Sequence, residues 1–454
     1  MLYNRTIAAI ATPLGESSIG VIRISGENAV SIADKVFFPF SGKPLSSLAG
    51  YRAAYGEIKQ SGKTLDDGVA LVFKAPKSYT GEDVVEISVH GGRILLRDIL
   101  RLILENGAAP AEPGEFTKRA FLNGKTDLTK AESIMGLISA KSESELRLSR
   151  AAHIGKLSEK TDKIIADLTA AAASVAAYSD YPDEDIEGLD RESFLKMLTA
   201  AKESITSMLS TYDAGRVLRE GIETVIVGKP NVGKSTLMNM LSGAERSIVT
   251  EVAGTTRDVI EETVTAGGIL LRLADTAGIH TTEDTVEKIG VERAKARIEA
   301  AELILAVFNS AEPLTDDDIK LINGIKNRSA IIILNKSDLE SKIDKTVFNG
   351  FITVETAAQS GNGYTELCRA IAEISGTASL DPDSAVLMNE RQRACAVRAL
   401  DGVIEAVNAI NSGCTLDAVG VCVDDALAAL LELTGRRVTN EVTDEIFRRF
   451  CVGK

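Results

Sequence analysis

The pattern of apolar and polar positions changes character three times along the 454-residue chain. In the first part, short apolar runs and alternations predict strands at 19–24, 68–73 and 84–89. Apolar residues at three- and four-residue steps predict one helix at 93–105. Strands and a helix in one segment favour an α+β domain, which we place at residues 1–120.

Helical spacing then extends from 121 to 216 and returns after residue 380. The acidic segment 180–187 interrupts the first block, and we interpret it as a solvated loop between two helices. The second block predicts helices at 394–409, 424–433 and 439–450. Because this block lacks an obvious core of its own, we expect it to pack on the first block as one split helical bundle.

Between the two helical blocks, strands and helices alternate, which predicts an α/β domain with a mostly parallel sheet. The chain is too long for a single core, so we expect a multidomain protein in which the α/β domain is inserted into the helical one. The predicted segments are 1–120, 121–216, 217–379 and 380–454.

The segment Gly228-Lys-Pro-Asn-Val-Gly-Lys-Ser235 directly follows an apolar run and predicts a phosphate-binding loop. Its glycines let the backbone approach closely, so that consecutive N–H groups can point at an anion beside a helix N-terminus. Lys234 would reach the β- and γ-phosphates of a nucleotide, and Ser235 would supply an oxygen ligand for Mg2+.

Two later motifs indicate the nucleotide switch and the base. Asp275-Thr-Ala-Gly278 ends another apolar stretch, where its carboxylate could hold Mg2+ through water. Asn335-Lys-Ser-Asp338 follows a third apolar run, and its carboxylate can accept hydrogen bonds from N1–H and the exocyclic amine of guanine. Adenine has no such donor pair, so the three motifs in this order predict a GTPase domain.

Charge and cysteine content limit the other function classes. The formal net charge is -14, which argues against wrapping nucleic acid by bulk electrostatics. The five cysteines lack C-x-x-C spacing, which favours reduced thiols. Since we find neither a leader pattern nor an apolar stretch of membrane-spanning length, we expect a soluble, cytoplasmic protein.

Longer strings extend over the whole chain. They include the phosphate loop with Asn231, the switch sequence Gly254-Thr-Thr-Arg-Asp258 and the C-terminal Phe450-Cys-Val-Gly-Lys454. The N-terminal strings are Thr6-Ile-Ala-Ala9, Ala11-Thr-Pro13, Ile22-Arg-Ile-Ser-Gly26, Tyr79-Thr-Gly-Glu-Asp83, His90-Gly-Gly92 and Pro113-Gly-Glu-Phe-Thr117. On these strings the chain resembles the MnmE (TrmE) family of tRNA modification GTPases.

This resemblance implies a folate-binding N-terminal domain that also forms homodimers, a split helical domain and an inserted Ras-like P-loop GTPase domain. It also implies a hetero-oligomer with the flavoprotein MnmG. Together the two proteins would add an aminomethyl or carboxymethylaminomethyl group to carbon 5 of the wobble uridine of certain tRNAs. The implied cofactors are GTP, Mg2+, K+ and a reduced folate, either 5,10-methylene- or 5-formyl-tetrahydrofolate. The tRNA would bind mostly through the partner.

The motifs and the resemblance together assign the GTP site. Its phosphate and first-switch residues are Asn231, Val232, Gly233, Lys234, Ser235, Thr236, Thr250, Glu251, Val252, Ala253, Gly254, Thr255 and Thr256. The second switch and the base-binding segments contribute Asp275, Thr276, Ala277, Gly278, Asn335, Lys336, Asp338, Ala357, Ala358 and Gln359. The resemblance implies that Mg2+ is held by Ser235 and Thr256, and K+ by Asn231, Thr250, Val252 and Thr255. From its residue type alone, Asn231 could instead be a simple turn former.

Ile279, which follows the D-x-x-G motif, has no hydrogen-bonding side chain, so another group must orient the attacking water. The resemblance implies that Glu287 is this catalytic residue. The alternative is that Glu287 is one of several charges on an exposed helix.

The resemblance places the folate at Arg23, Glu86, Lys125 and Lys454. A carboxylate can accept from the pteridine ring N–H and amino group, and a glutamyl tail prefers cations. From the pattern alone, Arg23 and Glu86 belong to a solvated strand face, Lys125 to a surface turn and Lys454 to a frayed terminus.

Cys451 is interpreted as an inert thiol, because no neighbouring activator is evident. The three histidines show no metal-ligand spacing. Two other function classes stay open. One is a ribosome-assembly or regulatory GTPase with a non-catalytic N-terminal interaction module. The other is a folate-dependent aminomethyltransferase that is active without GTP turnover.

Overall fold

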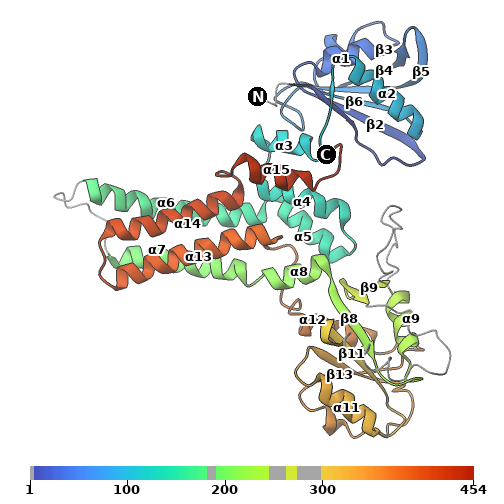
Figure 1. Ribbon diagram of the computed structural model, residues 1–454, viewed down its shortest axis with the longest axis vertical. Coiled ribbons are helices and arrows are strands. Elements are labelled where there is room, and N and C mark those ends of the chain that lie inside the picture. Colours follow the sequence, from blue (N-terminus) through green and yellow to red (C-terminus); the bar gives the residue numbers. More distant parts are fainter. Residues whose placement is uncertain (1–4, 181–190, 245–261, 274–297) are drawn as a thin grey trace. The chain divides into compact units, whose positions relative to one another are not determined.

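The computed structural model describes residues 5–180, 191–244, 262–273 and 298–454 (Figure 1). The chain forms two compact units. Unit 1 comprises Met1–Met135 and Leu431–Lys454, and unit 2 comprises Gly136–Leu430. The division into four segments stays a prediction.

Unit 1 contains a mixed sheet, whose strand order in the described residues is β3-β4-β5-β6-β2-β1-β7. The strands are β1 (Ile7–Ile10), β2 (Ser17–Ser25), β3 (Phe37–Pro39), β4 (Arg52–Gln60), β5 (Lys63–Phe73), β6 (Val84–Gly91) and β7 (Ala109–Pro110). Neighbouring strands are antiparallel except β1 and β7, which are parallel. The three strands predicted in this region are confirmed within β2, β5 and β6, and the predicted helix is α2 (Arg93–Glu105).

Phe116 packs with Ile7 and Ala9 on one face of this sheet, and the opposite face carries the larger apolar cluster. α1 (Ala29–Val36) and α2 bury their apolar sides against it, together with strand residues such as Ile22 and Ile87. Since successive strand residues point to opposite faces, Arg23 lies on the other face, directly across from Glu86. The alternation of the strands therefore leaves a polar face available for a site.

The C-terminal end of the chain packs within unit 1. α15 (Asn440–Arg448) begins after Thr439, whose side chain accepts a hydrogen bond from the N–H of Val442. Its Phe447, with Phe450 beyond the helix, joins an apolar cluster with residues of α4 (Leu128–Ser139). The predicted helix 439–450 is thus confirmed, and it ends before the last six residues.

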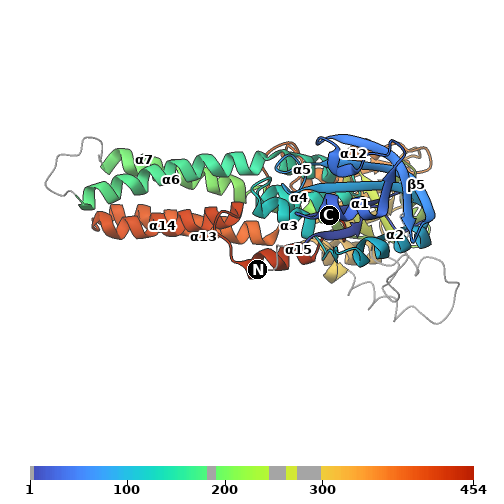
Figure 2. The ribbon, with the colours of Figure 1, turned by 90° about the horizontal axis from the view of Figure 1, so that it is seen from above.

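Unit 2 contains a bundle of long helices, which lie along one another in Figures 1 and 2. They are α6 (Lys156–Asp180), α7 (Arg191–Leu209), α13 (Glu390–Asn411) and α14 (Leu416–Thr434), and the shorter α5 (Glu143–Ile154) and α8 (Tyr212–Glu220) join them to the rest of the unit. α13 packs on α7, so the prediction that the second helical block packs on the first is confirmed. A Cβ at Gly402 of α13 would lie 3.0 Å from the carbonyl oxygen of Cys422, which shows how closely α14 approaches.

Two of these helices begin earlier than predicted. α13 begins at Glu390 because the side chain of Asn389 caps it, accepting a hydrogen bond from the N–H of Gln392. α14 begins eight residues before the predicted 424, because buried Val419 and Val423 continue its apolar stripe. Among the described residues, none of the helices has both the length and the apolar character needed to cross a bilayer.

The second sheet of unit 2 has the order β13-β12-β11-β8-β10-β9 in the described residues. Its strands are β8 (Ile222–Val227), β9 (Glu262–Ala266), β10 (Ile269–Leu273), β11 (Leu303–Asn309), β12 (Ala330–Asn335) and β13 (Ile352–Thr356). Pairing is parallel except between β9 and β10. This is the mostly parallel sheet that strand-helix alternation predicted.

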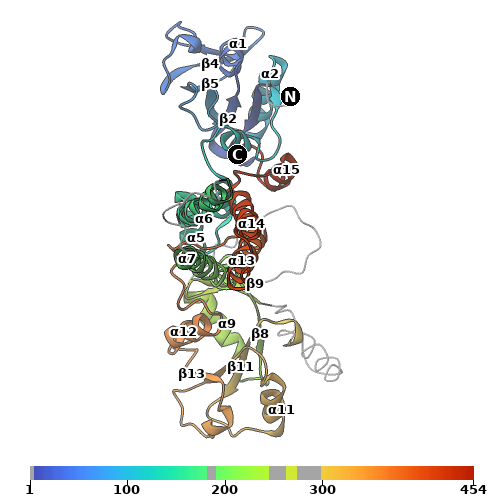
Figure 3. The same ribbon diagram turned by 90° about the vertical axis from the view of Figure 1, so that its left-hand side faces the viewer.

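Both faces of this sheet are buried. Leu305 and Ile333 enter one apolar cluster with α9 (Lys234–Ala244) and α12 (Tyr364–Ile374), and their neighbours Ala306 and Ile332 enter a second cluster with α11 (Asp316–Ile325). Figure 3 shows α11 and α12 on opposite sides of the sheet. Burial on both faces explains why the strands are continuous apolar runs.

Candidate functional sites

The phosphate loop connects the carboxyl end of β8 to the start of α9. Gly228 has φ +146°, and a Cβ there would collide with the carbonyl oxygen of Val307. Gly233 has φ +100°, and a Cβ there would collide with the amide nitrogen of Asn335. Only glycine permits both conformations and both close approaches. The backbone geometry therefore explains why the motif has glycine at these two positions.

The Lys234 side chain is hydrogen-bonded to the backbone of this loop. Its Nζ donates hydrogen bonds to the carbonyl oxygens of Gly228 at 2.8 Å and Lys229 at 2.6 Å. Burial lowers the pKa of Lys234 because it removes water from the ammonium. A phosphate would supply the missing opposite charge, so the loop is arranged to accept an anion.

Asn231 stands at the exposed tip of the loop with φ 63°, a left-handed conformation that asparagine tolerates better than most residues. This backbone agrees with the turn-forming interpretation. A role as a K+ ligand stays a prediction. Ser235 is exposed in the first turn of α9, where its hydroxyl is accessible to a metal ion, and Thr236 is half-buried.

Asn335 joins three of the predicted segments. Its Nδ2 donates to the carbonyl oxygen of Val232 at 2.9 Å, and its Oδ1 accepts the N–H of Ala358 at 3.1 Å and the hydroxyl of Thr356 at 3.3 Å. The phosphate loop, the 335–338 motif and the segment after β13 therefore meet at the carboxyl ends of the parallel strands. Ligands bind at these strand ends in open α/β sheets.

The rest of the predicted base-binding set lies around this junction. Lys336 has φ 61° and its carbonyl oxygen accepts the hydroxyl of Ser310 at 2.9 Å. Asp338 and Gln359 are exposed, and Ala357 is buried with Ala358. The exposed carboxylate of Asp338 is free to meet a base from solvent.

The remaining predicted GTP-site residues lie outside the described part of the chain. They are Thr250, Glu251, Val252, Ala253, Gly254, Thr255, Thr256, Asp275, Thr276, Ala277 and Gly278. The predicted catalytic residue Glu287, and Ile279 after the D-x-x-G motif, lie outside it too. Most of the acidic segment 180–187 lies outside it as well. The assignments of these residues stay predictions.

A second group of predicted residues meets on the polar face of the unit 1 sheet. Arg23 Nε donates to Glu86 Oε1 at 2.8 Å, and its Nη1 donates to the carbonyl oxygen of Gly453 at 3.1 Å. The guanidinium carbon lies 5.3 Å from the ring centroid of Tyr79 and 5.5 Å from that of Phe116. Arg23 and Glu86 are therefore partners in a half-buried site rather than parts of a solvated face.

The C-terminal tail is held at the same place. The N–H of Gly114 donates to the carbonyl oxygen of Cys451 and that of Phe116 to Lys454, both at 3.2 Å. Gly453 is buried with φ 96°, and a Cβ there would lie 2.5 Å from the carbonyl oxygen of Ile10. Lys454 is half-buried, so the expectation of a frayed terminus is wrong. Backbone hydrogen bonds pin the tail.

Lys125 is exposed in the turn after α3 (Glu115–Leu122), as predicted. Its Nζ donates to the carbonyl oxygen of Pro76 at 3.0 Å. Pro76 begins the loop that also carries Tyr79, whose ring lies under Arg23. The structure thus connects Lys125 to the Arg23 group through this loop.

The sequence did not single out the buried ion-pair network beneath that loop. Arg119 is 2% exposed and donates to both carboxylate oxygens of Glu82 at 3.1 Å and to Glu115 at 2.8 Å. Ser25 also donates to Glu82 at 2.7 Å. The four-residue spacing of Glu115 and Arg119 was the available signal, but it is common on exposed helices. The network fixes the loop that bears Tyr79.

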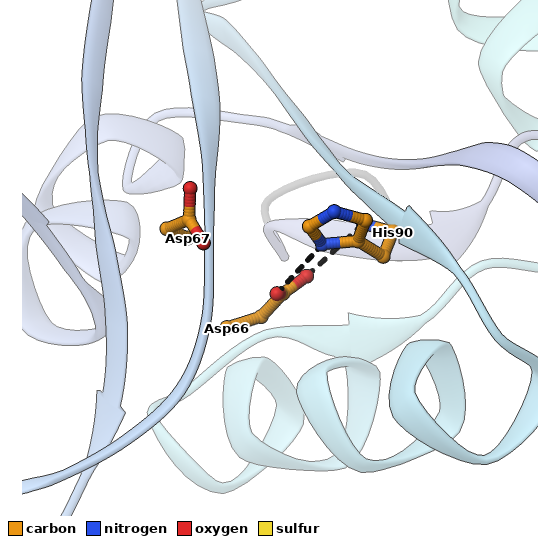
Figure 4. A group of neighbouring side chains, drawn as sticks. All are labelled: Asp66, Asp67 and His90. Carbon is orange, nitrogen blue, oxygen red and sulfur yellow. Dashed lines mark hydrogen bonds and ion pairs between the residues drawn. The ribbon is translucent and has the colours of Figure 1, made fainter.

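The structure also brings His90 beside two carboxylates, as Figure 4 shows. Ligand atoms of Asp66, Asp67 and His90 lie within 4.8 Å of one another, which the sequence separation did not suggest. Asp66 accepts hydrogen bonds from the backbone N–H of His90 at 3.0 Å and from its ring Nδ1–H at 2.8 Å. The Tyr55 hydroxyl donates to Asp67. Both carboxylates therefore already accept hydrogen bonds, and hydrogen bonding explains why these three side chains lie together.

Comparisons with known proteins cover the whole chain. The family described as "GTP-binding protein TrmE N-terminus" matches residues 6–125, and "MnmE helical domain" matches residues 128–451. The protein named "tRNA modification GTPase MnmE" from Alkaliphilus oremlandii is 43% identical over 100% of both chains. The chain belongs to the MnmE family.

Other relatives agree with this membership. Proteins of the same name from Bacillus subtilis and Lacticaseibacillus paracasei are 40% and 41% identical over 99% of this chain, and 100% and 98% of theirs. The solved FeoB G-domain from Methanococcus jannaschii covers 34% of this chain and 97% of its own, with 22% identity and a TM-score of 0.25. The resemblance to the MnmE family is confirmed. So is the fold class, an α+β N-terminal part, a split helical bundle and an inserted P-loop α/β domain.

Proposed function

We propose that this chain is a K+-activated, dimerisation-dependent GTPase that acts with the flavoprotein MnmG on the wobble uridine of certain tRNAs. The reaction adds an aminomethyl or carboxymethylaminomethyl group to carbon 5, with a one-carbon folate as donor. The main support is family membership over the full chain, combined with a phosphate loop and a guanine motif that Asn335 joins. We also propose the domain boundaries at residues 120, 216 and 379.

GTP binding follows from the chemistry of the loop. The Lys234 ammonium faces two carbonyl oxygens in the loop, and a bound phosphate would take over part of its hydrogen bonding. Ser235 offers an exposed hydroxyl to Mg2+, and we assign Thr256 as the second ligand. K+ would be held by Asn231 with Thr250, Val252 and Thr255, where it supplies positive charge to the transferring phosphoryl group.

Hydrolysis needs a group that orients water, and we assign this role to Glu287. Closure of the first switch over K+ would bring two GTPase domains together, so turnover depends on the homodimer. These assignments rest on the family, because the residues lie outside the described part of the chain.

The folate site is supported by the Arg23 group. Glu86 presents a carboxylate, 25% exposed, that can accept from a pteridine ring N–H and amino group. The partly exposed Tyr79 ring offers flat apolar surface beside it, and the buried Phe116 packs near Arg23. Lys125 and Lys454 are cations suited to a glutamyl tail, which would explain why the chain terminus is pinned to this unit.

Binding of tRNA is proposed to occur mostly through MnmG, because a net charge of -14 offers few phosphate contacts. The test is reconstitution of the full chain with tRNA, GTP, Mg2+, K+, a reduced folate and glycine, with and without MnmG. Mass spectrometry of the wobble uridine should find the modified base only with both proteins.

The outcomes separate the function classes. Modification by this chain without MnmG would contradict the proposed partnership. Folate-independent GTP turnover with no modification in the complete mixture would favour a regulatory GTPase. Modification that persists when Asp275 is replaced would favour an aminomethyltransferase with a dispensable GTPase.

A further inference from the structure

Lys229, the second residue of the phosphate loop, is tied to a carboxylate outside the loop. Its Nζ lies 2.9 Å from Asp318 Oδ2, and the two side chains are 31% and 10% exposed. Neither residue belongs to the nucleotide-binding set predicted from the sequence. An ion pair this sheltered is screened by salt much less than an exposed one.

Contacts other than the one with Lys229 hold Asp318 in place. It occupies the first turn of α11, where the same Oδ2 accepts the backbone N–H of Thr315 at 2.9 Å and its hydroxyl at 3.0 Å. This is a capping box, which fixes the start of the helix. The helix itself is buried against the sheet through Ile322 and Ile325. The carboxylate is therefore part of the rigid core of the domain.

Lys229 lies in the part of the loop between two anchors. On one side, Gly228 rests against the carbonyl of Val307. On the other, Val232 is held by Asn335 at 2.9 Å. Between these anchors lies the exposed tip with Asn231. The Lys229 carbonyl also accepts the hydrogen bond of Lys234 at 2.6 Å, so any displacement of Lys229 moves a partner of that ammonium.

From this geometry we propose that Lys229 and Asp318 are positioning residues, which hold the phosphate loop in its nucleotide-receiving conformation before a nucleotide enters. The inference rests on the proposed GTPase function. A loop that is already ordered loses less conformational entropy on binding. The pair should therefore speed nucleotide association and should favour the backbone around Asn231 that the K+ site would need.

The test measures association of a fluorescent GDP analogue with the full-length protein by stopped flow. The variants are Lys229→Met, Asp318→Asn and the double variant, with Lys229→Arg as the charge-retaining form. We expect each single variant to slow association roughly twofold to fivefold, the range of a partly exposed ion pair. The double variant should be no slower than the slower single one, because both remove one interaction. Lys229→Arg should recover most of the rate.

Two matched controls, one at the N-cap of α11 and one within it, separate positioning from damage to the helix. Thr315→Val removes the hydroxyl bond of the cap but leaves the ion pair, and Lys320→Met removes the exposed pair with Asp317. Both should associate at the wild-type rate. All variants should also show cooperative thermal unfolding, which confirms that the domain is folded.

Wild-type association in Lys229→Met, or losses that add in the double variant, would overturn the inference. Equal slowing in Thr315→Val would assign the effect to the helix cap instead and would equally overturn it. If the unmodified protein neither binds the GDP analogue nor hydrolyses GTP, the proposed function itself fails. That result differs from a failure of the positioning role alone.

Discussion

Replacing Glu86 with alanine removes the carboxylate that we assign to the pteridine. In the structure its Oε1 accepts the Nε–H of Arg23 at 2.8 Å, and the side chain is 25% exposed. A hydrogen bond to a charged group contributes about 1.5–3 kcal/mol. Since about 1.4 kcal/mol corresponds to a tenfold change in affinity, we expect the affinity for 5-formyl-tetrahydrofolate to fall roughly tenfold to 150-fold.

The same change should have little effect on folding. Without Glu86, Arg23 still donates a hydrogen bond to the carbonyl oxygen of Gly453 at 3.1 Å and still lies over the rings of Tyr79 and Phe116. Its charge is therefore not left without partners. A partly exposed ion pair contributes about 0–1 kcal/mol to stability. Glu86→Ala should therefore unfold close to the wild-type temperature while binding folate poorly.

Isothermal titration calorimetry of the full chain measures this difference. The matched control is Glu57→Ala, because Glu57 lies on β4 of the same sheet and pairs with Lys59 at 2.6 Å, away from Arg23. Its folate affinity should equal that of the wild type. Unchanged affinity in Glu86→Ala, or an equal loss in Glu57→Ala, would refute the assignment of Glu86 to the pteridine.

Three further predictions concern the GTP site and His90. K+ should accelerate GTP hydrolysis and Na+ should not, and Asn231→Ala should abolish the K+ response with GDP binding near normal. Equal rates in the two salts at matched ionic strength would contradict this cation mechanism. Glu287→Ala should raise the barrier of hydrolysis by roughly 2–4 kcal/mol in single-turnover assays while K+-dependent pairing persists, and an unchanged rate would exclude Glu287. The hydrogen bond to Asp66 raises the pKa of His90 above its ordinary value of 6.5. Protonated His90 therefore contributes its full stabilisation at pH values below 6.5, and this contribution is lost as the pH rises through the raised pKa. Asp66→Asn should lower that pKa in an NMR titration, and an unshifted curve would show that Asp66 is not the cause.

Much of the GTP site could be predicted from the sequence because each of its motifs is contiguous. The phosphate loop lies between one strand and one helix, and the 335–338 motif directly follows another strand. A local pattern of this kind specifies both the backbone shape and the ligand chemistry. The long apolar runs also predicted a mostly parallel sheet, since strands buried on both faces need apolar residues at successive positions.

The boundaries of elements were less predictable. Asn389 extends α13 by capping it, and Val419 and Val423 extend α14 through burial against neighbouring helices. Caps and buried stripes at helix ends depend on what surrounds them, so periodicity alone placed both starts too late.

The sequence by itself determined the GTPase motifs, the class of each domain and the family. Only the tertiary structure decided which distant residues meet. It joins Arg23 to Gly453 across 430 positions, Lys229 to Asp318 across 89 and Asp66 to His90 across 24. Such separations follow no period, because they are set by strand order and by the packing of whole elements rather than by the local backbone. For that reason the pinned C-terminal tail and the tethered phosphate loop became visible only in the folded chain.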